Sequence, residues 1–369
     1  MTDSLESGIL NLAASSDYVY TSGTVNGSFI PNNLDTPSTT FSQNGKGNVI
    51  VKYNSFDGSL KNVLQLDPKM YTTDLKVDED NQLWAIGTYL GQADLDPSDE
   101  NTIMSTGEEG IFLNCFNSED SLIYSWHKEI KSLLPSNMNI GDNHIIFNAP
   151  IRGKSNQDTA IFGGDTIFLG TGTESVYLLF DKEAKIQGTI SADYRSGNGG
   201  LTAILDKSEI HLSTPSLSHI RGLIDTTLNQ GVYESTYWIY DLNTKKYRLR
   251  KLIGIQREYP VGIWGDGYFV LTDSLILKQR DHGSDQVLYS FTPSVVNQGF
   301  QSPVYKTDFG KLYTYGEVRG KLNFGTDSLP RMITDGTDNS SSQDHYFGVF
   351  DSICQPIIDA TIYEEDIVQ

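Results

Sequence analysis

The sequence has very little cysteine. Only Cys115 and Cys354 occur among 369 residues, so the chain is not a disulfide-stapled scaffold, and two isolated cysteines match no metal-ligand spacing. Long hydrophobic runs are missing as well. Because no stretch of 18 apolar residues exists, the sequence contains no membrane-spanning helix.

Positive charge is also scarce. Lys and Arg number 27 against 47 Asp and Glu, which gives a formal net charge of −20. Such a field repels phosphate backbones and anionic lipid surfaces, so we expect neither nucleic acid binding nor membrane insertion. The segment MTDSLESGILNLAASS at the start has no basic region and no apolar core of the length found in secretion signals. We therefore expect either a cytosolic protein or one whose export signal is not part of this sequence.

The motifs that usually reveal an enzyme are missing too. The six histidines are dispersed without an H-x-x-x-H or H-E-x-x-H pair, and there is no G-x-S-x-G elbow, Walker A loop or sialidase-type S-x-D-x-G-x-T-W turn. A glycosidase, which needs two carboxylates about 5 to 10 Å apart, stays open as an alternative. Its candidate acids, near the ends of predicted strands, are Asp74, Glu258 and Asp308.

What the sequence does contain is an internal repeat. Residues 75–130 show it most clearly, as four short segments separated by polar stretches: LKVD, LWAIGTYLG, GIFLNCFN and LIYSWHKEI. We name these predicted strands a, b, c and d. The first and last parts of the chain follow the same order. Abundant turn-forming residues and an apolar set rich in Tyr and Phe also indicate short strands joined by tight turns.

Two markers give the repeat its register. An aromatic residue marks strand c at intervals of roughly 60 residues, at Tyr53, Phe116, Phe180, Tyr240, Phe291 and Phe350. A glycine ends strand b in four units, at Gly27, Gly91, Gly153 and Gly320, and the longer segment HLSTPSLSHIRG carries the same ending at Gly222.

This pattern predicts an all-β fold, a six-bladed β-propeller with four antiparallel strands per blade and one domain over residues 1–369. The expected blades span about 8–66, 73–130, 138–193, 199–254, 260–300 and 302–365, and the ring should close without a swapped strand. Cys115 and Cys354 then fall on different blades and should be free thiols. The expected core residues are Val51, Tyr53, Leu83, Trp84, Phe112, Phe116, Tyr177, Trp238, Tyr313 and Phe350.

The second unit resembles a known repeat. Its GTYLGQADLDPS segment, with Gly87, Gly91, Asp94, Asp96 and Pro97, is similar to the G-x-F-x-G-x-x-D-F-D-P pattern of the bacterial β-propeller repeat family of secreted Bacteroidota proteins. YGEVRGKLNFGTDS in the last unit looks like another copy but lacks both Asp residues and the Pro. The resemblance covers about a third of the chain. It implies a propeller fold, a secreted or surface-exposed protein, and a role in surface binding or assembly, without naming a ligand.

An acidic loop between strands b and c suggests one possible metal site. Asp94, Asp96 and Asp99 form D-x-D-x-x-D, and clustered carboxylates can hold Ca²⁺ through their oxygens. The spacing is not that of an EF-hand loop, and a solvated, turn-forming acidic loop is the simpler interpretation. No other cofactor is expected.

An aliphatic-Arg-Gly triplet recurs at the predicted end of strand b, with arginines at Arg152, Arg221 and Arg319. Equivalent positions would place them on one rim of the ring. They would either make inter-blade salt bridges or stack on aromatic rings, or form an anion-binding rim. Tyr259 and Trp264, in EYPVGIWGDGY beside a predicted d–a crossing, are the aromatic residues expected near the same face.

Together these patterns favour a non-catalytic binding or assembly module at the bacterial cell surface. Its b–c and d–a loops would emerge on one face and bind a protein or glycan, because loops on a rigid scaffold usually carry the contacts. The alternative is a degenerate carbohydrate-active propeller enzyme with acidic residues at the central channel.

Overall fold

The chain is described by a computed structural model, which covers residues 8–26, 46–97, 105, 107–130, 134–153, 158–169, 173–192, 202–214, 219–223, 226–227, 236–251, 258–264, 267–272, 277–281, 287–291, 294–296, 301–308, 311–318, 321–323, 344–350 and 356–362. Every regular secondary-structure element in these ranges is a β-strand. The all-β prediction is therefore confirmed, and strands occupy more than two fifths of the chain, as the period-2 apolar segments predict.

Most strands belong to four-stranded antiparallel meanders that follow one another along the chain. The first three comprise β1 (Gly8–Ala14), β2 (Tyr18–Asn26), β3 (Lys46–Asn54), β4 (Leu60–Leu66); β5 (Met70–Val77), β6 (Leu83–Leu90), β7 (Glu109–Phe116), β8 (Leu122–Glu129); and β9 (Ser136–Ile140), β10 (His144–Arg152), β13 (Thr173–Asp181), β14 (Ile186–Ala192).

The fourth to sixth sheets repeat this arrangement. They comprise β15 (Thr202–Asp206), β16 (Glu209–Thr214), β19 (Thr236–Asp241), β20 (Lys246–Lys251); β21 (Glu258–Trp264), β22 (Gly267–Thr272), β23 (Leu277–Asp281), β24 (Val287–Phe291); and β26 (Gln301–Asp308), β27 (Lys311–Val318), β29 (Asp344–Phe350), β30 (Pro356–Ile362). In the first and sixth sheets alike, all four strands come from one continuous part of the chain.

Short additional strands arise from the connections between the main ones. The link from β10 to β13 contains a hairpin, β11 (Asp158–Phe162) and β12 (Asp165–Leu169). The link from β16 to β19 contains β17 (His219–Gly222) and β18 (Thr226–Thr227), and β17 pairs with the outer strand of the third sheet, β14. A further pair joins β25 (Ser294–Val296) to β28 (Lys321–Asn323).

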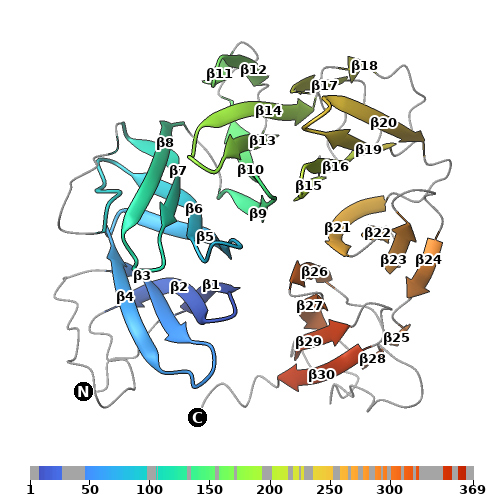
Figure 1. The fold of residues 1–369 in the computed structure, drawn as a ribbon, viewed down its shortest axis with the longest axis horizontal. Coiled ribbons are helices and arrows are strands. Elements are labelled where there is room, and N and C mark those ends of the chain that lie inside the picture. The colour runs from blue at the N-terminus through green and yellow to red at the C-terminus, as the bar shows by residue number, and fades with distance from the viewer. Residues whose placement is uncertain are drawn as a thin grey trace.

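The sheets fan out around a common centre, with the first strand of each one innermost (Figure 1). Successive inner strands touch in the order β1, β5, β9, β15, β21 and β26. Within the described ranges no contact of comparable extent joins β26 back to β1. Radial four-stranded sheets in this order are the architecture of a β-propeller.

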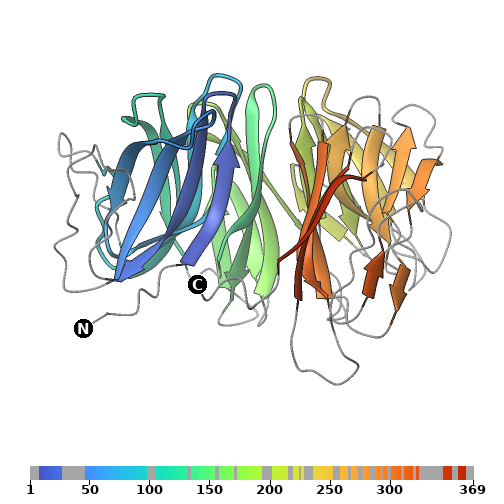
Figure 2. The same cartoon turned by 90° about the horizontal axis from the view of Figure 1, so that it is seen from below.

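Antiparallel order separates the connections into two faces, seen edge-on in Figure 2. Links from the first to the second strand and from the third to the fourth strand lie on one side, here called the turn face. Links from the second to the third strand, and from each sheet to the next, lie on the opposite side, here called the loop face. Successive strands reverse direction, so this division follows from the topology.

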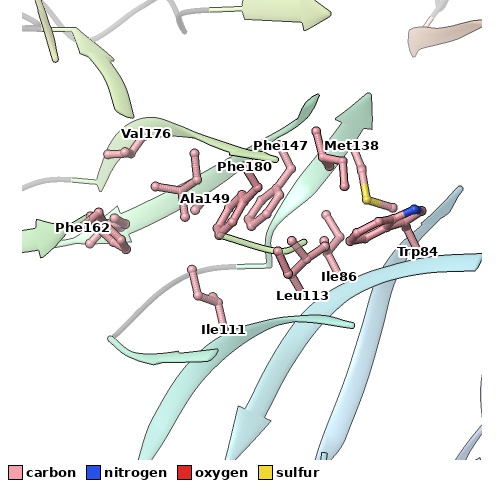
Figure 3. Packing of buried hydrophobic residues seen from close by; sticks show 14 of the residues in the cluster. Trp84, Ile86, Ile111, Leu113, Met138, Phe147, Ala149, Phe162, Val176 and Phe180 are labelled. Atoms are coloured by element: carbon pink, nitrogen blue, oxygen red, sulfur yellow. The ribbon is translucent and has the colours of Figure 1, made fainter. Parts of the chain in front are cut away.

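The core lies between neighbouring sheets, which explains why β6 and β7 are buried along nearly their whole length. Between the second and third sheets, Trp84 and Leu113 face Phe147 and Phe180 (Figure 3). The rings of Phe147 and Phe180 stack with centroids 5.5 Å apart. Burying both faces of a strand removes the usual alternation of polar and apolar residues.

The predicted core is confirmed where side chains are described. The fully buried members are Val51, Leu83, Trp84, Phe112, Phe116, Tyr177 and Trp238. Tyr53 is partly buried against Val49 and Val51. The side chains of Tyr313 and Phe350 lie outside the described part.

Phe291, which the sequence analysis placed on the third strand of the fifth unit, lies on the fourth strand, β24. The third strand there is β23, with the sequence LKQRD, which contains no aromatic residue. The aromatic marker therefore identified the wrong strand in this unit.

Candidate binding face

The turn face is built from repeated Asx turns, in which a side-chain oxygen accepts a hydrogen bond from the backbone N–H two residues later. The bonds measure 2.8 to 3.0 Å. The residues that accept them are Asn54, Asp78, Asn117, Asp181 and Asp241. Four of the five directly follow an aromatic residue that marks strand c, so an aromatic-Asx dipeptide is the signal that the sequence analysis overlooked.

Ion pairs join neighbouring sheets near the turn face. Asp78, after β5, accepts hydrogen bonds from Lys182 Nζ of the third sheet at 3.1 Å and from the indole Nε1 of Trp84 at 2.9 Å. Lys52 on β3 reaches the Asp120 carboxylate of the second sheet at 3.1 Å. The acidic and basic groups of this region therefore hold blades together, as expected for charges that become buried only when paired.

The acidic loop after β6 folds back onto the second sheet at the loop face. The backbone N–H of Asp94 donates to Asp67 Oδ2 at 2.9 Å, and that of Asp96 donates to Asp94 Oδ1 at 3.1 Å. Leu95 is fully buried, and its carbonyl accepts the side-chain amide of Asn114 at 2.8 Å. These bonds are what a turn-forming acidic loop would make. Asp99 lies outside the described residues, and no cluster of three or more metal-binding side chains occurs among those that are described.

Arg152 occupies the predicted rim position. It is the last residue of β10, opposite Thr173, and its side chain is exposed. No salt bridge to Arg152 occurs in the described part of the chain. The structure thus places the Arg152 side chain in solvent at the loop-face end of β10. Arg319 directly follows β27 and lies outside the described residues.

The structure contradicts the equivalence of Arg221 with Arg152. The segment expected as one long strand is divided, because β16 ends at Thr214 and Arg221 lies on β17, opposite Ser191 of the neighbouring sheet. Gly222 explains the tight junction that follows. Its φ is +99°, and a β-carbon there would lie 2.0 Å from the Thr189 carbonyl oxygen, so only glycine fits.

Thr189 on β14 is the point where two loop insertions meet the third sheet. Its carbonyl accepts the N–H of Leu223 at 2.6 Å, directly after β17. Its own N–H and hydroxyl donate to Asp165 Oδ2 of the hairpin β11–β12, at 3.1 and 3.2 Å. The loops of the third and fourth sheets are thus anchored to the same outer strand.

The prediction for Trp264 is also wrong. Tyr259 lies near the start of β21, at the loop face, as expected, but Trp264 is the last residue of that strand and pairs with Gly267 across the next turn. Trp264 therefore lies at the turn face, the opposite end of the inner strand. A seven-residue strand spans about 20 Å, so the two aromatic residues do not share one surface.

Of the acids considered for glycoside hydrolysis, Glu258 and Asp308 lie too far apart to form a catalytic pair. Asp74 accepts the backbone N–H groups of Leu75 and Met138, both at 2.9 Å, and so joins the inner strands of the second and third sheets. Glu258 begins β21 at the loop face, whereas Asp308 ends β26 at the turn face. Paired catalytic carboxylates must lie within about 10 Å, and these two stand at opposite ends of neighbouring strands.

Asn11 joins the inner strands of the first two sheets, as Asp74 joins those of the second and third. The side-chain amide of Asn11 donates to the Thr72 carbonyl at 3.2 Å. A register shift accompanies both positions, between Ile9 and Asn11 on β1 and between Thr72 and Asp74 on β5. A bulge in the inner strand followed by an Asx residue is thus a second structural device that the sequence analysis missed.

No protein-family model matches the chain, and no curated protein matches its sequence. Among the described residues no helix is long and apolar enough to cross a membrane.

Solved structures with similar folds include BamB from Moraxella catarrhalis (9% identity, TM-score 0.36, 96% of this chain and 74% of that one) and the computationally designed Ika8 protein (11%, 0.43, 96% and 87%). A third is the β-propeller domain of the Trilobed protease from Pyrococcus furiosus, described as having an open velcro topology (10%, 0.47, 97% and 99%). The propeller assignment of this chain rests on its own strand topology and the radial order of its sheets.

Proposed function

We propose that this chain is a non-catalytic binding or assembly module at the bacterial cell surface, a closed six-bladed propeller whose loop face binds a protein or glycan. The observation that carries the proposal is the difference between the two faces. Among the described links, the turn face is rich in tight, internally hydrogen-bonded Asx turns, whereas links on the loop face carry extra strands such as the hairpin β11–β12 and the strand β17. Binding surfaces are commonly loop insertions on a rigid scaffold.

Closure of the ring is supported by the side of the first sheet that faces away from the second sheet. Val49 and Val51 are buried on the side facing away from the second sheet, in a cluster with Tyr53, Leu60 and Val63. Among described residues this cluster includes no member from another sheet. In a closed ring the sixth sheet covers this side, which removes its apolar surface from water.

The proposal is tested with the double variant Arg152→Glu/Arg319→Glu. The variant should no longer capture partners from the surface fraction of the producing cell. Its thermal stability should stay nearly unchanged, because exposed charges contribute only about 0 to 1 kcal/mol each. The matched control, Lys61→Glu/Lys185→Glu, makes the same charge change away from the loop face and should retain the partners. If R152E/R319E unfolds the chain, these arginines are structural clamps and no longer support the proposal. Turnover of a glycan by the unmodified chain would contradict it outright.

A further inference from the structure

The outer strand of the fourth sheet carries a concentration of positive charge that the proposed loop face does not explain. Five of the chain's 27 basic residues fall within the seven positions of KKYRLRK, residues 245–251. They are Lys245, Lys246, Arg248, Arg250 and Lys251, in a chain of net charge −20. Lys245 and Lys246 are exposed, and neither forms a salt bridge with any described residue.

This basic segment coincides with a free sheet edge. β20 is the last strand in the order β15-β16-β19-β20, paired on one side with β19 from Lys246 to Lys251. No described strand pairs with its other side, and Figure 1 shows β20 at the outer rim. An unpaired edge presents a row of backbone N–H and C=O groups to any extended chain that approaches it.

The neighbouring sheet shows that this position can accept another strand. On the third sheet, β14 occupies the place that β20 occupies on the fourth, and its outer edge is taken by β17 through the pairs of Ile190, Ser191 and Ala192. The fourth sheet has no such addition within the described ranges. The same architecture thus carries one filled outer edge and, beside it, one open edge rich in lysine and arginine.

We propose that β20 is a docking edge for an acidic, extended segment of a partner protein, which adds to the fourth sheet as a fifth strand. Backbone hydrogen bonds would supply affinity and the lysine and arginine residues would select acidic side chains. A nucleic acid is the less favoured occupant, since a chain of net charge −20 repels a polyanion along its length. A short acidic strand carries few charges and uses the open edge itself.

The experiment uses the full chain and a fluorescent peptide of about eight residues that alternates glutamate with valine. Three probes accompany it: the same peptide with alternate backbone nitrogens methylated, a peptide with lysine in place of glutamate, and a single-stranded oligonucleotide. Fluorescence anisotropy is measured at low and physiological salt. Methylation leaves the charge intact and removes the N–H donors, so it separates strand addition from simple charge attraction.

We expect the acidic peptide to bind, methylation to weaken it at least about tenfold, and the variant Lys246→Glu/Arg250→Glu to abolish it. The control Lys61→Glu/Lys185→Glu changes basic residues at the corresponding starts of the outer strands of the first and third sheets and should bind like the unmodified chain. Equal binding of the methylated peptide, or preferential binding of the oligonucleotide, would overturn the proposal. So would the absence of peptide binding; aggregation of K246E/R250E would then show that the charges only protect the edge from self-association.

Discussion

Lys52 and Asp120 form a buried ion pair across the interface of the first two sheets. Lys52 Nζ lies 3.1 Å from Asp120 Oδ1, and each side chain is 7% exposed. The lysine also donates to the Ser118 carbonyl and lies 4.1 Å from the centroid of the Tyr18 ring, while Asn62 donates to the other Asp120 oxygen at 2.8 Å. The pair is thus satisfied on both sides, which is the condition under which buried charges are tolerated.

Removing one member of this pair should destabilise the chain strongly. Asp120→Asn keeps a residue that accepts the observed φ of +66° but leaves Lys52 without its counter-charge, at a cost of about 3 kcal/mol. The free energy of unfolding in urea measures this. The double variant Lys52→Met/Asp120→Asn should recover most of the loss, whereas Lys185→Met, which breaks an exposed pair with Glu183, should change nothing measurable. Equal stability of D120N and the unmodified chain would show that the pair is not buried in solution.

Gly222→Ala should release β17 from the third sheet. A β-carbon would collide with the Thr189 carbonyl, so the N–H of Leu223 should lose its protection in hydrogen exchange. Gly91→Ala is the matched control, because Gly91 also has a positive φ of +73° but has open space where the β-carbon would stand. G91A should cost about 1 kcal/mol from backbone strain alone. Similar exchange in G222A and the unmodified chain would mean that β17 does not pair with β14.

This junction illustrates what sequence patterns could and could not predict. Alternation and turn residues identified the β class, the four-strand unit and most of the buried residues, because these depend on local order and burial. The division of the segment before Arg221 depends on a pairing with another sheet, a contact that local periodicity does not record. Trp264 was misplaced for a related reason, since its face depends on which end of β21 it occupies.

Stability should fall as the pH drops below about 6.5, the ordinary pKa of histidine. Burial lowers the pKa of His127 and that of His144. The folded chain therefore binds fewer protons than the unfolded chain, so stability is fully present above the unfolded pKa and is lost as the pH falls toward the folded values. The double variant His127→Gln/His144→Gln should reduce the slope of the melting temperature against pH between about pH 5 and 6.5. An unchanged slope would assign the effect to other groups.

Cys115 should resist thiol reagents in the folded chain. It is fully buried on β7, its thiol donates to Gln82 Oε1 at 3.6 Å, and burial raises its pKa. In a Cys354→Ser variant, a colorimetric thiol assay should find no reactive group in buffer and one in denaturant without reductant. Rapid reaction in buffer would indicate that the interface between the second and third sheets opens.

The central claim is that six sheets form one closed ring, and spin-label distances test it directly. Labels go in pairs on the turns or strand ends after successive inner strands, at Ser16, Glu79, Asp142 and Asp308, in a chain without native cysteines. Each of these positions lies at the turn-face end of its inner strand. In a closed ring the distance from Asp308 to Ser16 should have the same mean and width as those from Ser16 to Glu79 and from Glu79 to Asp142. A longer or multiple distribution for the pair Asp308 and Ser16 alone would show that the first and sixth sheets do not meet.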